Sequence, residues 1–368
     1  MNVKDDSSPS KNGVGKAVLF QEIDGTTYDV GLPLDSKVDI KEIMTELSLP
    51  NYIDLEYYPM RSAIVTLWAS QKASELHKLY PHAYEKEISN KSISTLLFGG
   101  GAVKIHCQHS NGKGALSRAI KDMDTIIPKS QGSNFIRLLL NMDKAFGTQF
   151  KFFKTKADAL FNAMRQGQRY RVKAVNGVTE QGLPTVTVLD IFCDCIDLRH
   201  KVEVKDSFDH CRQNLFTIGL EYLILSKCQL IMDLPKTDLN LVEQQGQTFR
   251  ILPYDHYSQD KIILGMEEKD TRDVCAIFLD HPVGEGAEQI NVGKIRKALE
   301  KDKKLALTVT LNLQNLIGRT GLMEKWMSKS EASSVVERVR AVLDACPRID
   351  KKWDKPWWNT AVETPLIE

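Results

Sequence analysis

Two aspartates stand two residues apart in a short, otherwise apolar segment, DMDTII, which a proline ends. Asp122 and Asp124 lie within residues 119–127, whose apolar and β-branched residues predict a β-strand that stops at Pro128. Side chains alternate between the two faces of a strand, so both carboxylates project from the same face, about 7 Å apart. Two like charges placed together favour a bound cation, and Mg²⁺ prefers such oxygen ligands. The segment therefore predicts a sheet with a metal-binding pair of acids; a solvated strand face is the alternative.

A run of three glycines, Gly99, Gly100 and Gly101, precedes this strand in the chain. The apolar residues 93–98 before the run predict a buried strand, and residues 102–108 after it predict a short helix. Glycine lets a phosphate approach the backbone closely at the start of a helix, where unpaired N–H groups favour anions. The run predicts a phosphate-binding turn, and an ordinary tight turn is the alternative.

A third acid, Asp190, lies in the apolar segment TVTVLDIF (residues 185–192), which predicts a further strand. A carboxylate within an apolar run is costly to bury unless it is paired or bound to a metal ion. We therefore expect Asp190 to complete the same metal site. Two alternatives remain open: an exposed position at the end of the strand, or metal binding by Asp194 or Asp197 in its place.

A lysine occupies the apolar side of a predicted helix at residues 219–231. On a helical wheel, Lys227 lies among the apolar residues Leu220, Leu223, Ile224 and Ile231. Such a lysine must either extend its amino group to solvent or meet an anion. The phosphates of a nucleoside triphosphate would suit it.

Two further acids, Asp270 and Asp273, share one face of a predicted helix with Val274 and Ile277. On that inward face they would position Lys227 or an arginine, or assist proton transfer. Structural salt bridges are the alternative.

These motifs follow one another in a recognisable order: a strand and GGGA, then RAIKDMD, VLDIF, LILSKCQ and EKDTRD. In this order they resemble the AbiEii-type (MenT-like) nucleotidyltransferases of the DNA polymerase beta superfamily, over roughly residues 91–315. The resemblance implies a mixed sheet with helices and a Mg²⁺- or Mn²⁺-dependent transfer of a nucleoside monophosphate from ATP or another NTP. It assigns metal binding to the three aspartates and phosphate contact to the glycines and the lysine. Asp270 and Asp273 match the late acidic motif of the family.

The resemblance leaves the acceptor of the nucleotide open, because RNA, a protein hydroxyl and a small molecule would all serve. Toxin-like activity and an antitoxin-type protein partner are further implications. The competing hypothesis is a catalytically silent protein that binds a nucleotide or a partner on the same fold.

The chain divides into four predicted regions. Residues 1–15 are polar and predict a disordered tail, and residues 16–90 predict a β-rich region that includes the candidate strands IDLEYYP and SAIVTLW. Residues 91–210 form the predicted nucleotidyltransferase core, and residues 211–368 predict a mainly helical C-terminal region. The predicted fold class is mixed α+β (α/β), with a polymerase-beta-like core.

Composition restricts where the protein works. The chain is 42% hydrophobic and 26% charged, with a formal net charge of +1, so no global basic field indicates nucleic-acid binding. No signal peptide begins it, and no apolar run approaches the roughly 20 residues that span a bilayer. Seven cysteines without a disulfide framework favour a reducing compartment. We expect a cytoplasmic protein without a membrane partner.

A group of cysteines and histidines suggests zinc: Cys193 and Cys195, with His200, His210 and Cys211 nearby. Zinc sites usually space their cysteine pairs by two to four residues, so the C-x-C spacing favours buried structural cysteines instead.

Two smaller features carry weaker hypotheses. His106 and His109 flank a glycine-containing loop and predict solvent-facing or supporting roles. The tail KKWDKPWWN combines lysines with tryptophans, which favours a nucleic-acid contact, packing against the helical half or docking to a partner.

Overall fold

The computed structural model describes residues 20–23, 26–29, 39–79, 93–146, 151–178, 184–211, 216–238 and 249–361, which leaves the predicted tail at 1–15 outside. The chain forms two compact units. Unit 1 comprises Met1–Leu97, Ala119–Asp194 and Phe208–Phe216. Unit 2 comprises Phe98–Arg118, Cys195–Ser207 and Thr217–Glu368.

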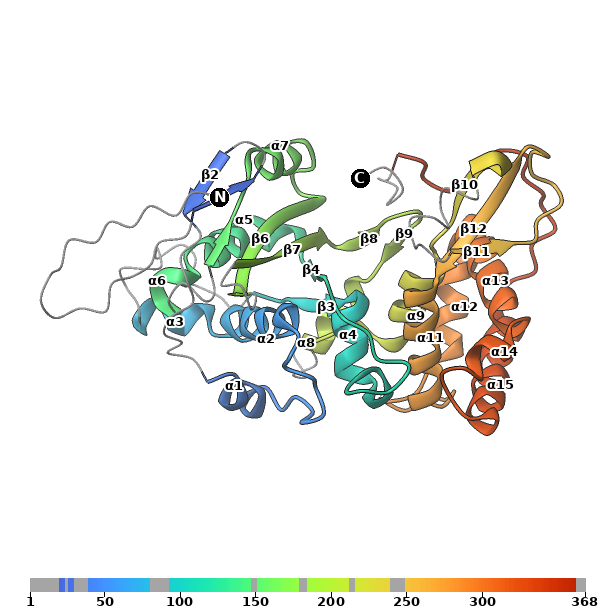
Figure 1. The fold of residues 1–368 in the computed structure, drawn as a ribbon, viewed down its shortest axis with the longest axis horizontal. Helices are drawn as coiled ribbons and strands as arrows, with labels where there is room; N and C mark the ends of the chain where they lie inside the picture. The colour runs from blue at the N-terminus through green and yellow to red at the C-terminus, as the bar shows by residue number, and fades with distance from the viewer. Residues whose placement is uncertain are drawn as a thin grey trace, which may run out of the picture. The chain divides into compact units, whose positions relative to one another are not determined.

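A five-stranded sheet forms the centre of unit 1 (Figure 1). Its strands, in the spatial order β3-β4-β7-β6-β5, are β3 (Leu96–Phe98), β4 (Asp122–Ile127), β7 (Pro184–Cys193), β6 (Arg169–Val178) and β5 (Lys151–Phe153). Strand β4 runs parallel to β7, whereas β7, β6 and β5 pair antiparallel. The sheet is therefore mixed, and with the helices around it the predicted mixed α+β class is confirmed.

The other elements of unit 1 are seven helices and a two-stranded hairpin among its described residues. They are α1 (Ile40–Glu46), α2 (Tyr58–Gln71), α3 (Ala73–Leu79), α5 (Gly132–Leu140), α6 (Met142–Phe146), α7 (Lys156–Met164), α8 (Phe208–Cys211), β1 (Phe20–Ile23) and β2 (Thr26–Asp29). Helix α2 packs against β4, β6 and α5.

Helix α2 corrects a prediction. The segment SAIVTLW was expected to form a strand, but it lies inside α2, and IDLEYYP forms turns that lead into the same helix. Ile64, Val65 and Leu67 are all buried, and so are most residues of α2. A helix buried on every side shows no 3.6-residue period, so its β-branched residues resemble a strand.

Unit 2 combines helices with two small antiparallel sheets (Figure 1). Its helices are α4 (Gly99–His106), α9 (Leu220–Cys228), α11 (Glu268–Asp280), α12 (Val292–Lys301), α13 (Lys303–Ile317), α14 (Thr320–Met323) and α15 (Lys329–Ala345). Its strands are β8 (Cys195–Asp197), β9 (Lys201–Glu203), β10 (Met232–Pro235), β11 (Phe249–Leu252) and β12 (Lys261–Glu267). Helix α11 contacts α4, α9 and α15. No helix in the described ranges is both long enough and apolar enough to cross a membrane.

The Trp-rich tail packs inside unit 2. Trp357 and Trp358 are 2% and 7% exposed, and they join a core cluster with Leu307 and Leu311 of α13. The indole N–H of Trp357 donates to Oγ1 of Thr308 at 2.9 Å. Of the three hypotheses for the tail, packing against the helical half is confirmed.

Candidate functional site

The three predicted metal-binding aspartates lie on two adjacent parallel strands of unit 1. Asp122 and Asp124 are on β4, and Asp190 on β7 is the register partner of Asp124. Residues two apart on a strand, and residues paired across neighbouring parallel strands, project from the same face of a sheet. Asp122 is exposed, Asp124 is half-buried and Asp190 is 9% exposed. The sheet thus gathers three acids on one face, as predicted.

Two arginines of β6 hold Asp190. Nη2 of Arg169 lies 2.7 Å from Oδ2 of Asp190, and Nε of Arg171 lies 2.9 Å from Oδ1. The guanidinium of Arg169 also lies over the ring of Phe192, and that of Arg171 over the ring of Phe161. The hypothesis of an exposed strand end for Asp190 is therefore wrong. Its charge is compensated by ion pairs, one of the two conditions under which such a carboxylate is buried.

Sequence reasoning missed both arginines. Arg169 and Arg171 alternate on β6 and face one side of the sheet, but only the antiparallel register with β7 places them against Asp190. The sequence does carry a weak signal for this contact. Arg169 and Arg171 are two residues apart on a strand, and two cations on one face of a central strand need anions nearby.

The carboxylates of Asp122, Asp124 and Asp190 do not converge to within 4.8 Å of one another, as ligands of a single ion would. Asp122 and Asp124 offer oxygen donors on an accessible face and fit Mg²⁺ or Mn²⁺ as ligands. Asp190 fits less well, because its oxygens are already engaged by Arg169 and Arg171.

The two substitutes considered for Asp190 have other positions. Asp194 adopts a positive φ of 61°, and its Oδ1 accepts from the backbone N–H of Lys129 at 3.1 Å. Asp197 lies on β8, in unit 2. The carboxylate of Asp194 therefore supports a turn at the end of β7.

The glycine run forms the first turn of α4 in unit 2. The helix begins at Gly99, not at the predicted residue 102, and Gly99 has a φ of 63°, which favours glycine. A Cβ at position 100 would lie 2.5 Å from Nη2 of Arg118. The guanidinium of Arg118 therefore rests against the backbone of Gly100, at the positive end of the helix dipole.

Arg118 belongs to a buried network of four charges in the same unit. Its Nη2 lies 2.6 Å from Oδ2 of Asp273, and Nζ of Lys227 lies 2.8 Å from both Asp270 and Asp273. Asp273 contacts both Lys227 and Arg118, which agrees with the predicted positioning of Lys227 or an arginine and equally with the alternative of structural salt bridges. The alternative that Lys227 extends to solvent is wrong, since its side chain is only 11% exposed.

The network fixes the charge of its members. Burial lowers the pKa of Lys227, but Asp270 and Asp273 together outweigh this effect and raise the pKa above its ordinary value. Burial raises the pKa of Asp273, but Lys227 and Arg118 outweigh this effect and lower the pKa to about 2. Lys227 and Asp273 therefore stay charged at neutral pH, and the cluster pairs two basic side chains with two acidic ones.

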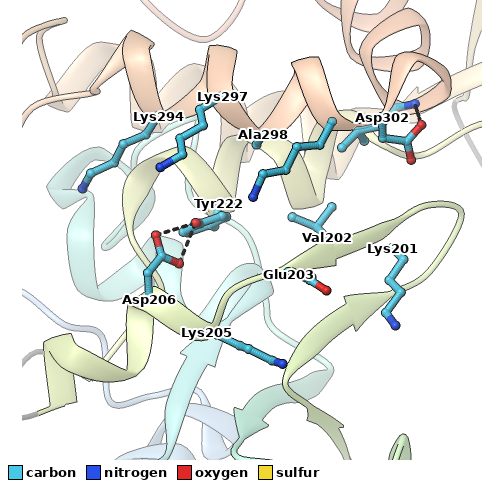
Figure 2. A pocket seen from close by; sticks show the side chains of 12 residues that line it. Lys201, Val202, Glu203, Lys205, Asp206, Tyr222, Lys294, Lys297, Ala298 and Asp302 are labelled. Atoms are coloured by element: carbon cyan, nitrogen blue, oxygen red, sulfur yellow. Dashed lines mark hydrogen bonds between the residues drawn. The ribbon is translucent and has the colours of Figure 1, made fainter.

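A pocket of about 680 Å³ lies elsewhere in unit 2, between β9, α9 and α12 (Figure 2). Five lysines and three acids line it: Lys201, Lys205, Lys294, Lys297, Lys301, Glu203, Asp206 and Asp302. Figure 2 shows Lys294 and Lys297 extending from α12 on the same side as Tyr222. Sequence reasoning missed this pocket, because β9 and α12 are far apart in the chain.

The acids of the pocket do little to balance its lysines. The hydroxyl of Tyr222 hydrogen-bonds to both oxygens of Asp206, at 2.6 and 2.7 Å. Asp302 caps α13 by accepting from the backbone N–H of Lys304 and Leu305. Within the described part of the chain, the five lysines form no ion pair, so the pocket favours anions.

The zinc alternative does not assemble from the described residues of that motif. Cys193 and Cys195 are buried cysteines outside any disulfide, as their spacing favoured. The side chains of His210 and Cys211 lie outside the described set. A different group does come together in unit 2: His106, which was expected to play a solvent-facing or supporting role, joins His281 and Glu288.

Comparison with known proteins gives no relative: no family model, no curated protein and no solved structure matches the chain.

Proposed function

We propose that this protein is a Mg²⁺- or Mn²⁺-dependent nucleotidyltransferase, which moves a nucleoside monophosphate from an NTP to an acceptor hydroxyl. The observation that carries the proposal is the position of Asp124, in register with Asp190 on a parallel strand and two residues from Asp122 on the same face. Carboxylates gathered on one face of a sheet favour the binding of divalent cations, which in turn bind the phosphates of a nucleotide.

In the proposed reaction, the acceptor hydroxyl gives its proton to solvent and its oxygen forms a bond to the α-phosphorus of the NTP. The bond from that phosphorus to the bridging oxygen of the β-phosphate breaks, and pyrophosphate leaves with the bonding electrons. Divalent cations at these carboxylates would supply Lewis-acid stabilisation of the charge that develops on the phosphate oxygens. Asp122 and Asp124 are the residues that would hold them.

The arginines give Asp190 a different part. Arg169 and Arg171 hold its carboxylate in place, away from Asp122 and Asp124. We therefore assign Asp190 a positioning and electrostatic role.

The residues of unit 2 support binding of phosphates. The first turn of α4 presents backbone N–H groups beside the guanidinium of Arg118, a combination that suits a phosphate oxygen. Asp273 holds that guanidinium in place through an ion pair. Lys227 in turn contacts both Asp273 and Asp270. We assign them to positioning, with Gly99, Gly100 and Gly101 as the proposed phosphate contacts.

The acceptor is the least defined part of the proposal. Among RNA, a protein hydroxyl and a small molecule, the five unpaired lysines of the unit 2 pocket favour an acceptor that carries phosphates, and so RNA. We also propose a toxin-like role with an antitoxin-type partner. Growth arrest of a host that expresses the protein, relieved by co-expression of the partner, would support this role.

One set of observations favours the second candidate, a silent nucleotide- or partner-binding protein. One acid of each predicted acidic site is held by ion pairs, Asp190 by two arginines and Asp273 by Lys227 and Arg118. A site that has lost turnover retains such pairs as structural contacts.

Incubation with each α-³²P-labelled NTP, Mg²⁺ and total RNA or lysate separates the two candidates. Label transfer that the Asp122→Ala, Asp124→Ala double variant abolishes supports the transferase and identifies the acceptor by its size. Nucleotide binding without transfer supports the silent protein, and the absence of both contradicts the assignment of the acidic site.

A further inference from the structure

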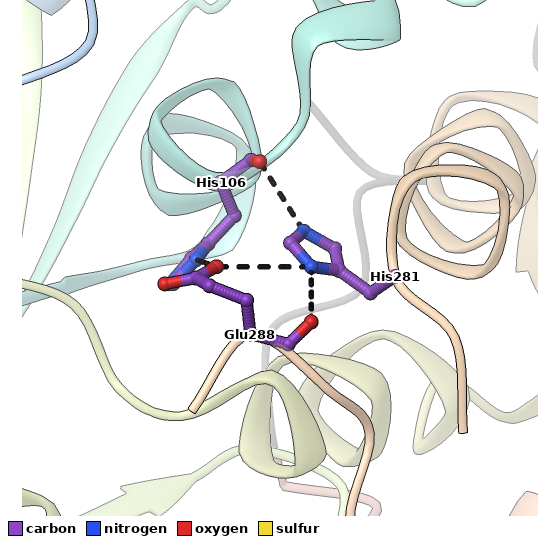
Figure 3. A group of neighbouring side chains, drawn as sticks. All are labelled: His106, His281 and Glu288. Atoms are coloured by element: carbon purple, nitrogen blue, oxygen red, sulfur yellow. Dashed lines mark hydrogen bonds and ion pairs between the residues drawn. The ribbon is translucent and has the colours of Figure 1, made fainter. Parts of the chain in front are cut away.

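His106, His281 and Glu288 form a compact group in unit 2 that the proposed transfer does not use (Figure 3). His106 ends α4, and the loop that follows α11 carries the other two residues. Nδ1 of His106 lies 3.9 Å from Oε2 of Glu288, and Nδ1 of His281 lies 3.8 Å from the same oxygen. Two imidazole nitrogens and one carboxylate oxygen thus surround one point.

The opposite nitrogen of each ring is engaged away from that point. Nε2 of His106 lies 2.5 Å from Oγ1 of Thr217, and Nε2 of His281 lies 3.2 Å from the backbone carbonyl of His106. Both of these oxygens can accept a ring N–H, and the tautomer with the proton on Nε2 leaves a lone pair at Nδ1 for a metal ion. In metal sites, ligating histidines are held in this way by partners of their second nitrogen.

The lone pair of His281 faces oxygens rather than donors. Its Nδ1 lies 2.9 Å from the backbone carbonyl oxygen of Glu288, besides the nearby carboxylate. A lone pair among oxygen acceptors is repelled unless a cation, either a proton or a metal ion, lies between them.

The spacing suits a metal ion. Bonds of about 2.0–2.1 Å in a tetrahedral zinc site separate neighbouring ligand atoms by about 3.4 Å. The observed separations of 3.8 and 3.9 Å from Oε2 are within about half an ångström of that value. The side chain of Glu288 is 67% exposed, which leaves one side open for a water ligand. Two imidazoles and a single carboxylate match zinc better than Mg²⁺, which prefers oxygen ligands.

The loop that carries Glu288 is held by its own backbone. Ile290 donates to the carbonyl of Pro282 at 2.9 Å, and Gly284 donates to the carbonyl of Ile290 at 3.1 Å. The side chain of Gln289 closes the turn by accepting from the N–H of Gly286 at 2.9 Å. These hydrogen bonds hold the loop in a conformation that places the carboxylate of Glu288 near His281.

We propose that His106, His281 and Glu288 form a zinc site that ties this loop to the end of α4. The proposal is independent of the transferase reaction and stands on the geometry of these three residues.

Zinc binding to the full chain tests the proposal. Chelator-treated protein is titrated with Zn²⁺ in excess Mg²⁺, which occupies sites built from carboxylates alone. The expected result is one zinc ion per chain, with a dissociation constant that Glu288→Gln raises by at least about tenfold. Glu285→Gln, an exposed residue of the same loop, is the matched control and leaves the affinity unchanged.

Co²⁺ provides a second readout that a general loss of folding does not mimic. Its visible absorption reports four-coordinate nitrogen and oxygen ligands in the wild type and in Glu285→Gln, and it weakens in Glu288→Gln. The absence of stoichiometric zinc binding would overturn the proposal and leave a proton as the cation at Nδ1. Equal affinity in the wild type and Glu288→Gln would overturn it as well.

Discussion

Asp124 of β4 lies in register with Asp190 of β7, on parallel neighbouring strands that are about 4.8 Å apart. Arg169 and Arg171 neutralise Asp190 from the far side of β7, because β6 pairs with β7 in the antiparallel direction. On this face of the central sheet of unit 1, the acids of β4 and β7 are therefore followed by the bases of β6. This arrangement lets one face of a sheet carry three carboxylates without unfolding from their mutual repulsion.

The ion pairs of Asp190 are expected to stabilise unit 1. Asp190→Asn leaves two partly buried guanidinium groups without a counter-charge, which should reduce the free energy of unfolding by about 2 kcal/mol. Arg171→Met combined with Asp190→Asn should cost less than the sum of the single changes, with a coupling of about 1 kcal/mol. Urea denaturation of the four proteins measures this, with the exposed Arg165→Met as control. Strict additivity would show that the contact contributes nothing.

Lys227 is expected to be essential for the stability of unit 2. Lys227→Met leaves Asp270 and Asp273 buried beside an apolar side chain, at a cost of about 3 kcal/mol or more. Lys269→Met on the same helix as these acids removes an exposed ion pair and should cost less than about 1 kcal/mol. Chemical denaturation followed by circular dichroism compares the two. Similar losses in both variants would contradict a buried network.

His200 should make the stability of unit 2 depend on pH. Burial lowers the pKa of His200 from 6.5 to about 4, so the folded protein keeps the ring neutral where the unfolded chain protonates it. Above about pH 7 the ring is neutral in both states and His200 does not change the free energy of unfolding. As the pH falls from about 6.5 toward 4, the free energy of unfolding decreases progressively. The expected loss by pH 5 is about 2 kcal/mol.

The measurement is the free energy of unfolding at pH 7 and pH 5 for the wild type, His200→Asn and the exposed His256→Asn. We expect His200→Asn to reduce the difference between the two pH values, and His256→Asn to leave it nearly unchanged. If His200→Asn shows the same difference in the free energy of unfolding between pH 7 and pH 5 as the wild type, groups other than His200 cause that difference.

The lysine-lined pocket is expected to bind phosphates. Replacement of Lys294, Lys297 and Lys301 by glutamine should weaken binding of a single-stranded RNA oligonucleotide and reduce the slope of log affinity against log salt by about 2. The matched control replaces three exposed lysines of the tail: Lys351, Lys352 and Lys355. An unchanged slope in the pocket variant would exclude the pocket as the site.

Local periodicity accounts for the parts of this structure that could be predicted. Asp122 and Asp124 share a face because strand side chains alternate, and Lys227 meets Asp270 and Asp273 because helical spacing placed all three on inward faces. The mixed α+β class followed from alternating strand and helix patterns. These features depend on a few neighbouring residues, or on two amphipathic faces that need a partner.

Other features depend on pairings that the sequence does not encode locally. The contact of Arg171 with Asp190 arises from the register of β6 against β7. The sequence of helix α2 resembles that of a strand, because burial on all sides removes the 3.6-residue hydrophobic period of a helix. Glu288 returns to His281 through a loop closed by backbone hydrogen bonds, which side-chain patterns do not reveal.

The most direct test of the central claim is the rate of NMP transfer by Asp124→Asn. We predict that its rate falls by about a thousandfold relative to the wild type, because a metal ligand is lost, while nucleotide binding and the free energy of unfolding change little. Asp143→Asn, a substitution in α6 of the same unit, should transfer at the wild-type rate. Transfer by Asp124→Asn at the rate of the wild type would contradict the proposed function.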